Sequence, residues 1–213
     1  MIHTEKEVIL PETLQLLIKL QQDPLLDVFF LVGGTALALH IGHRLSIDLG
    51  LFSGEPFDTN ELETHLALKY KFGTDYLATN TLKGFIDNIK VDFITHAYKL
   101  VKPVISTQGL RLASIEDIGA MKLNAIAHSG NRQKDFYDLY FILEHKSLAT
   151  LLHAYETKYP QSNPMIPLKG LTYFEDIDFA LEKPMLRRKA TFQQVKDRLL
   201  QAEKFPHPLF QPE

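Results

Sequence analysis

A pair of glycines at the end of an apolar run constrains the fold of this chain more than any other feature. Val28–Val32 is typical of a buried strand, and Gly33-Gly34-Thr35 follows it and opens a short helical stretch that ends near Gly42. Glycines at such a junction let backbone N–H groups approach a phosphate, because no Cβ intervenes and the helix N-terminus is partially positive. A strand predicted over Leu45–Phe52 completes a strand–helix–strand unit with an anion site at its glycines.

Asp48 lies in the second of these predicted strands. If Ile47, Leu49 and Leu51 face the core, the two-residue period places Asp48 on the opposite face, with position 50 beside it. Metal-assisted nucleotidyl transfer uses two or three carboxylates to hold Mg²⁺ against triphosphate oxygens. A carboxylate at position 50 would complete such a clamp, and this chain has Gly50 there.

Asp92 is the second candidate carboxylate. Asp92 interrupts the apolar strand pattern Ile89–Ile94. An unpartnered carboxylate in such a strand is costly to desolvate, so we expect Asp92 to have a partner. The alternative is an edge strand that exposes both Asp48 and Asp92 to water. We expect the two aspartates to bind metal together, next to the glycine junction.

Composition limits the remaining classes. The 213 residues, 45% of them hydrophobic, can bury a core as one domain or two small ones. A formal charge of −3 argues against an overall basic nucleic-acid surface, although local basic patches stay compatible with it. The lack of cysteine excludes disulfides and thiolate metal sites. With no secretion signal and no apolar run approaching about 18 residues, we expect a cytoplasmic protein without a membrane segment.

The N-terminal half carries the patterns of an α/β or α+β domain. Leu14–Leu20 predicts a helix, Asp58–Glu61 predicts a second helix start, and two or three further strands are expected between Phe72 and Thr95. We therefore predict a mixed sheet with helices over residues 1–112.

From residue 114 the apolar pattern becomes helical. Ser114 and Asp117 form a start signal for the first helix of this half. We expect residues 113–213 to form a helical C-terminal region that closes a cleft over the sheet. The predicted elements are helices over Ile115–Ala125, Phe136–Leu143, Leu148–Tyr159 and Thr191–Lys204, and a loop over Pro160–Gly170.

The first two of these helices carry a block of charges. Lys134 and Asp138 share a helix face, as do Arg132 and Asp135. One interpretation is surface ion pairing, worth a few tenths of a kcal/mol per pair. The other is that Lys122 and Lys134 reach triphosphate oxygens, while Asp135 and Asp138 orient them or act as a base.

Three further features bear on the site. Arg44 either binds phosphate near Asp48 or is a solvated loop arginine. His40 and His43 flank the short helix without the spacing of a zinc site. The acidic and aromatic stretch Tyr173–Asp178 is either a second magnesium site or, more in keeping with its pattern, a helix start or packing segment.

These residues resemble a known family, the AbiEii/AbiGii-type toxins of the nucleotidyltransferase superfamily, found in bacterial abortive-infection and toxin–antitoxin systems. Residues 33–39 and 42–49 are similar to its Gly-Gly-Thr motif and its Arg-x-Ser-x-Asp-Leu-Asp segment. Lys122 and Lys134–Leu139 are similar to its later Lys and Lys-Asp-x-x-Asp-Leu motifs, and Tyr173–Asp176 also resembles a family segment. The resemblance extends from about residue 28 to about residue 180.

The resemblance implies a nucleotidyltransferase-like fold that, with Mg²⁺, transfers a nucleoside monophosphate from an NTP to a hydroxyl on RNA, such as tRNA, or on protein. It also implies a cognate antitoxin. Asp48 and Asp92 would bind the metal, Lys122 and Lys134 would neutralise the triphosphate, and Asp135 and Asp138 would support them. The residues expected to hold phosphate are Gly33, Gly34, Thr35, Arg44 and Ser46.

Gly50 departs from the family pattern, which has an aspartate there. An engineered change, a natural member that binds without transfer, or a site completed by Glu55 or Asp58 would each account for it. Losing one carboxylate ligand should slow transfer about a hundred-fold or more. Two other functions therefore stay open: a non-catalytic protein that binds nucleotide or a partner, and a transferase acting on a small molecule.

Overall fold

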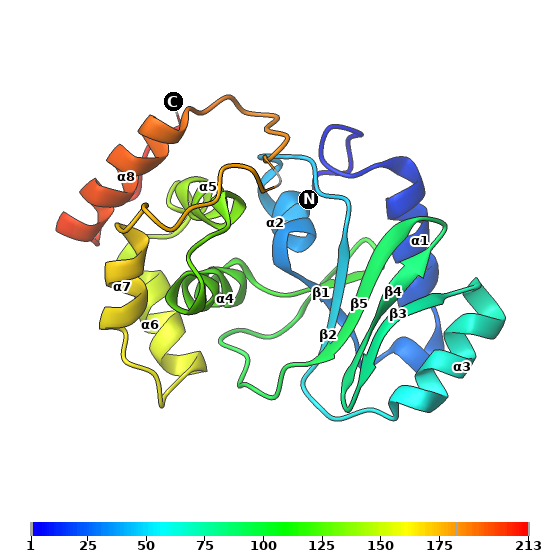
Figure 1. The fold of residues 1–213 in the computed structure, drawn as a ribbon. Helices are drawn as coiled ribbons and strands as arrows, with labels where there is room; N and C mark the ends of the chain where they lie inside the picture. Colours follow the sequence, from blue (N-terminus) through cyan, green and yellow to red (C-terminus); the bar gives the residue numbers. More distant parts are fainter. Residues whose placement is uncertain (1, 182, 213) are drawn as a thin grey trace.

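A seven-stranded mixed sheet lies at the centre of the part of the chain that this computed structural model describes, residues 2–181 and 183–212 (Figure 1). The strands are β1 (Phe30–Val32), β2 (Leu49–Ser53), β3 (Gly73–Ala78), β4 (Thr81–Ile86), β5 (Ile89–Thr95), β6 (Ile105–Thr107) and β7 (Leu110–Leu112). Their order is β3-β4-β5-β2-β1-β7-β6. β2 runs parallel to β5 and antiparallel to β1, and β1 runs parallel to β7, so the predicted mixed sheet is confirmed.

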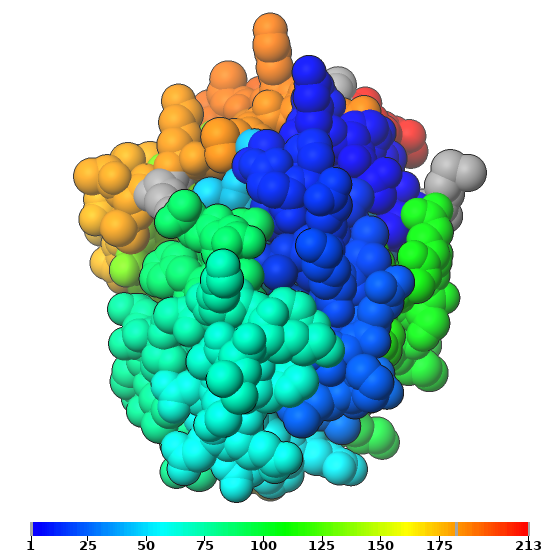
Figure 2. Space-filling model, turned by 90° about the vertical axis from the view of Figure 1, so that its right-hand side faces the viewer, coloured from blue at the N-terminus to red at the C-terminus, as the bar shows by residue number. Residues whose placement is uncertain are grey.

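Helices cover both faces of this sheet. α1 and α3 lie on one side, while α2 and the C-terminal helices lie on the other (Figure 1). Figure 2 shows the first side, where the blue N-terminal residues lie beside the cyan residues of α3. The helices are α1 (Pro11–Gln21), the 3₁₀ turn η1 (Pro24–Leu26), α2 (Gly33–Ile41), α3 (Thr59–Tyr70), α4 (Ile115–His128), α5 (Gln133–Ile142), α6 (Leu148–Lys158), α7 (Met165–Leu171) and α8 (Phe192–Lys204).

Several local signals act as predicted. Gly42 ends α2 in the left-handed conformation, with φ 62°. The Ser114 hydroxyl accepts the Asp117 N–H and caps α4, and Thr191 caps α8 in a capping box. Each signal uses hydrogen bonds within one turn, which is why the local sequence suffices to place these helix ends.

The strand predicted over Leu45–Phe52 is shorter, because β2 begins only at Leu49. The backbone before Leu49 forms its hydrogen bonds outside the sheet. The Ser46 N–H donates to the Val8 carbonyl, and the Leu45 N–H donates to the Met185 carbonyl. Ile47 is therefore exposed, and the prediction that it faces the core is wrong. Asp48 precedes the strand and lies at its entrance.

Three other predictions need correction. The strand predicted from Val28 begins at Phe30, since η1 turns the chain and leaves Val28 exposed. The predicted loop over residues 160–170 contains α7, in which Pro167 occupies the first turn, where its missing N–H costs no helical bond. β6 and β7 were not predicted, since three-residue strands give too short a pattern.

The two halves of the chain interlock. The last strand of the sheet ends at Leu112 and α4 begins at Ile115, but the segment before α8 returns to the N-terminal half. There the Arg187 N–H donates to the His43 carbonyl, and Arg44 forms a β-bridge with Leu186. A division into domains 1–112 and 113–213 stays a prediction.

Candidate functional site

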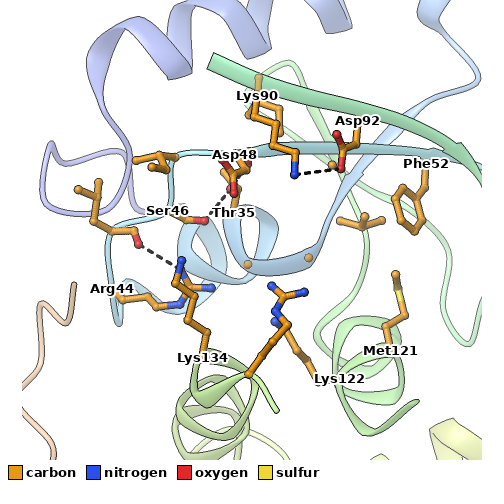
Figure 3. A pocket seen from close by; sticks show the side chains of 18 of the residues that line it. Thr35, Arg44, Ser46, Asp48, Phe52, Lys90, Asp92, Met121, Lys122 and Lys134 are labelled. Atoms are coloured by element: carbon orange, nitrogen blue, oxygen red, sulfur yellow. Dashed lines mark hydrogen bonds and ion pairs between the residues drawn. The ribbon is translucent and has the colours of Figure 1, made fainter. Parts of the chain in front are cut away.

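A cavity of about 510 Å³ lies where β2, β5 and the start of α2 meet the C-terminal helices (Figure 3). Most of the residues predicted for the site line it. Those that do are Gly33, Gly34, Thr35, Arg44, Ser46, Asp48, Asp92, Lys122 and Lys134, and Gly50 lines it as well.

The N-terminus of α2 opens into this cavity. Gly33 has φ 69°, a conformation that glycine adopts without strain. A Cβ on Gly34 would lie 2.1 Å from Nη2 of Arg44, so a side chain there would displace that guanidinium. No side chain caps the helix, whose N-cap is Val32. Its first N–H groups are therefore available to an anion.

Thr35 positions the segment that carries Asp48. Its buried hydroxyl lies 2.8 Å from Oγ of Ser46 and donates to the backbone carbonyl of Asp48. These bonds fix the Asp48 backbone over the start of α2, as Figure 3 shows. Because the Thr35 hydroxyl is occupied within the protein, its place in the site is to hold this segment.

Asp92 lies directly beside Gly50. The two residues are partners in the parallel register of β2 and β5. Oδ1 of Asp92 is buried without a hydrogen-bond partner, and Oδ2 lies 4.0 Å from Nζ of Lys90. Burial raises the pKa of the Asp92 carboxyl, and the nearby Asp48 adds to this rise. A cation placed between the two aspartates would offset both the burial of the Asp92 carboxylate and its repulsion by Asp48.

A buried charge network supports the opposite wall. The Asp138 carboxylate accepts from Nε and Nη2 of Arg44 at 2.7 and 3.0 Å, and from Nε2 of His43 at 2.8 Å. Nζ of Lys122 lies 2.7 Å from Asp138 and 2.5 Å from Asp135. Although burial disfavours its ionised form, the cations Arg44 and Lys122 hold the pKa of Asp138 well below its usual range.

The same network keeps its two cations charged. Burial opposes the protonated form of Lys122, but the carboxylates of Asp135 and Asp138 outweigh it and raise the pKa of the Lys122 ammonium. Arg44 behaves in the same way, since Asp138 more than offsets its burial. The cavity therefore keeps fixed positive charge at the wall next to α2.

These contacts correct two interpretations of the sequence. Asp135 and Asp138 are buried, although Asp135 keeps the predicted pair with the exposed Arg132 at 3.9 Å, and Arg44 is buried rather than solvated. Neither aspartate lines the cavity. Their place beneath Lys122 and Arg44 fits the predicted orienting role. A base must reach a substrate hydroxyl, and Asp138, with 0% of its surface exposed, has no access to one.

The structure adds cavity residues that the sequence analysis did not assign to the site. Lys90 lies two residues before Asp92 on β5, so the two-residue strand period already placed both on one face. Lys183 comes from the segment before α8, which carries no recognisable motif. Phe52, Ile94 and Met121 form an apolar end of the cavity.

Other predicted candidates lie outside the cavity. Asp58 caps α3 through the N–H groups of Asn60 and Glu61, and Glu55 does not line the cavity, so neither replaces the missing carboxylate here. His40 bonds to the Ala113 carbonyl. In the stretch 173–178, Phe174 packs against Phe136, in agreement with the packing interpretation.

Two aspartates are a small donor set for a metal ion. The described residues contain no group of three or more His, Asp or Glu side chains arranged to hold a metal. Mg²⁺ is nevertheless commonly bound through one or two carboxylates together with substrate phosphates and water. The unpartnered Oδ1 of Asp92 beside Asp48 fits that mode, in which the nucleotide supplies the remaining oxygens.

Comparison with known proteins decides the family. Residues 15–204 match the model of the family described as nucleotidyl transferase AbiEii toxin, type IV toxin–antitoxin system. The chain belongs to this family. The resemblance carried by the glycine, aspartate and lysine motifs is thus confirmed, and so is the nucleotidyltransferase-like fold.

Relatives of this AbiEii-family chain include an uncharacterized protein of Aquifex aeolicus. It is 34% identical over 154 residues, which are 70% of this chain and 74% of the relative. Among solved structures, JHP933 from Helicobacter pylori has a TM-score of 0.55 at 18% identity, covering 92% of this chain and 90% of that one. A candidate nucleotidyltransferase from H. pylori has a TM-score of 0.53 at 16% identity, covering 92% and 95%. These two structures share the fold.

None of the helices in the described residues is long and apolar enough to cross a membrane.

Proposed function

We propose that this protein transfers a nucleoside monophosphate from an NTP to a hydroxyl group of an RNA, such as tRNA, or of a protein, with Mg²⁺ as cofactor. As a member of a toxin family it would act in the cytoplasm, where NTPs are available, and would be paired with a cognate antitoxin.

One observation carries the proposal: a single cavity brings Asp48 and Asp92 face to face with an uncapped helix N-terminus and fixed cations. The cations around it are Arg44, Lys90, Lys122, Arg132, Lys134 and Lys183. A triphosphate carries several negative charges, and helix N–H groups with lysine and arginine are its usual partners. The two carboxylates have a different role, which is to hold a metal ion against those phosphates.

The reaction follows from this arrangement. The acceptor oxygen attacks the α-phosphorus of the NTP, the bond from that phosphorus to the bridging oxygen breaks, and pyrophosphate leaves with the electron pair. The hydroxyl proton passes to the Asp92 carboxylate, whose side chain is 23% exposed and borders the cavity. Lys122 and Lys134 stabilise the charge on the leaving pyrophosphate. Bound Mg²⁺ would supply further charge stabilisation between the nucleotide and Asp48 and Asp92.

The test is label transfer from each of four α-labelled NTPs, with Mg²⁺, to total bacterial RNA and protein. We expect label on an acceptor with the natural chain and at least ten-fold less with Asp92→Asn, which keeps the shape but removes the proton acceptor. Asp197→Asn, at an exposed position on α8 outside the cavity, is the matched control. Equal labelling by the natural chain and Asp92→Asn would refute the assignment of Asp92.

A second function is favoured by Gly50. With two carboxylates rather than three, the same cavity can bind a nucleotide without transferring it. Nucleotide binding by the natural chain without label transfer to RNA, protein or a panel of small hydroxyl compounds would support this binding role. Label on a small compound alone would instead indicate a small-molecule transferase.

A further inference from the structure

The cavity has two chemically different ends. Its cations and the start of α2 occupy one end, whereas Phe52 and Met121 lie at the other, beyond Asp92 (Figure 3). Ile94 lines this second end too. Polyphosphate chemistry uses the first end only. The second end presents a ring and two other apolar side chains to the cavity, and nothing in the proposed transfer step accounts for them.

The position of Phe52 follows from the sheet. Phe52 is two residues after Gly50 on β2, and Ile94 is its register partner, two residues after Asp92 on β5. The two-residue period therefore points both side chains to the same face as the reacting centre. A group joined to the α-phosphate or to the attacking hydroxyl and directed toward this end of the cavity would lie against Phe52.

An aromatic tract continues from Phe52 to the surface. Its ring centroid lies 5.6 Å from that of His96, which lies 4.7 Å from the ring of Tyr98. Tyr98 is 50% exposed, and the exposed residues Lys99 and Lys102 follow it. Burial lowers the pKa of His96 to about 4, so this ring is neutral at pH 7 and extends an uncharged stacking surface.

The loop that carries this tract is firmly held. The buried Asp117 carboxylate accepts the N–H groups of Val101 and Lys102 at 3.0 and 3.1 Å and pairs with Lys158 at 2.9 Å. Exposed aromatic rings on a fixed loop, with lysines beside them, are the features on which unpaired bases stack.

We propose that Phe52, with Ile94 and Met121, forms a nucleobase-stacking subsite at the apolar end of the cavity. The base belongs either to the NTP or to the acceptor nucleotide. This inference rests on the proposed function, because it takes the cationic end as the polyphosphate site. Stacking on Phe52 would fix the sugar that carries the reacting group, which makes Phe52 a positioning residue for transfer.

The experiment uses three probes: inorganic tripolyphosphate, each of the four NTPs, and a short single-stranded RNA of mixed sequence. Calorimetry compares their affinities for the natural chain, for Phe52→Leu and for Phe85→Leu. Phe85 is an exposed phenylalanine of β4 outside the cavity and serves as the matched control. A stacked ring accounts for roughly a 5- to 150-fold gain in affinity, so a loss of this size is expected with Phe52→Leu.

The pattern of losses identifies the source of the base. Weaker binding of NTP with unchanged binding of tripolyphosphate assigns the subsite to the donor nucleotide, and weaker binding of RNA alone assigns it to the acceptor. Because the chain contains no tryptophan, Phe52→Trp adds a unique fluorophore that also keeps a ring in place. Its emission should be quenched by NTP or RNA and not by tripolyphosphate.

Failure of the proposed function and failure of the nucleobase subsite give different results. If tripolyphosphate does not bind the natural chain, the polyphosphate site of the proposed function is wrong, while the fluorescence of Phe52→Trp still reports on the ring. If tripolyphosphate binds, and neither Phe52→Leu nor the fluorescence responds to NTP or RNA, the nucleobase subsite is overturned.

Discussion

Arg44 and Asp138, 94 residues apart, are joined by two parallel hydrogen bonds of 2.7 and 3.0 Å in the interior of the protein. The pair ties the segment between α2 and β2 to helix α5, and so fixes one wall of the cavity to the other. Planar, two-point pairing of this kind is characteristic of arginine with a carboxylate.

Asp138→Asn should therefore destabilise the protein by about 3 kcal/mol or more, because it leaves the buried charges of Arg44 and Lys122 without their common partner. Urea unfolding followed by circular dichroism measures the loss. Asp197→Asn, at an exposed position on α8, should stay within about 0.5 kcal/mol of the natural chain. Equal stability of the two variants would show that the network contributes little.

Gly50→Asp should raise label transfer about a hundred-fold or more. The backbone at this position has room for a side chain, since a Cβ would make ordinary contacts, the nearest at 3.4 Å to Cγ2 of Val32. The new carboxylate would lie beside Asp92 and complete the metal ligands. Gly54→Ala, in the turn after β2, is the control for adding a side chain in open space. Unchanged transfer with Gly50→Asp would mean that the site works with two aspartates or serves binding alone.

Gly34→Ala should weaken the binding of tripolyphosphate at least ten-fold and lower the stability by about 1 to 3 kcal/mol. The added methyl group would overlap Nη2 of Arg44 and push the guanidinium off Asp138. Calorimetry and urea unfolding check the two effects. Gly33→Ala distinguishes backbone strain from steric overlap with Arg44. The φ of 69° at Gly33 strains a non-glycine residue, but a Cβ there contacts nothing within 4 Å. If Gly33→Ala and Gly34→Ala weaken binding equally, displacement of Arg44 is not the cause.

Acidification should destabilise the fold before the carboxylates titrate. Burial, followed by the charge of Lys158, lowers the pKa of His96 to about 4, whereas the unfolded chain has the ordinary value of about 6.5. Between these values the unfolded state binds more protons, so stability falls as the pH falls through this window. The loss from His96 between about pH 7 and about pH 5 should be up to about 2 kcal/mol.

Urea midpoints of the natural chain and of His96→Phe at the two pH values measure this contribution. The variant keeps a ring beside Tyr98 and Tyr159 but has no proton to bind. Its midpoint should therefore change less with pH than that of the natural chain. A steeper change in the variant would contradict the assignment. The depressed pKa values of Asp23, Asp117 and Glu144 act at lower pH, below the usual range of carboxyl groups.

The local units of this protein could be predicted from its amino-acid sequence: the glycine junction, the ends of α2 and α4, and the presence of Asp48 and Asp92 in strand-like surroundings. Hydrophobic periodicity and helix caps depend on residues within a few positions of one another, so they can be recognised directly in the sequence. The missing carboxylate at Gly50 was also visible in the sequence alone.

Which of these residues lie together depends on the tertiary structure. The register of β2 and β5 places Asp92 beside Gly50, the packing of α5 buries Asp138 against Arg44, and the segment before α8 brings Lys183 to the cavity. Such contacts join residues far apart in the chain, and they depend on strand order and helix packing that no local pattern specifies. The apolar end of the cavity at Phe52 also depends on tertiary structure. A phenylalanine ring on a strand lines a cavity only when another element packs opposite it, as α4 does here with Met121.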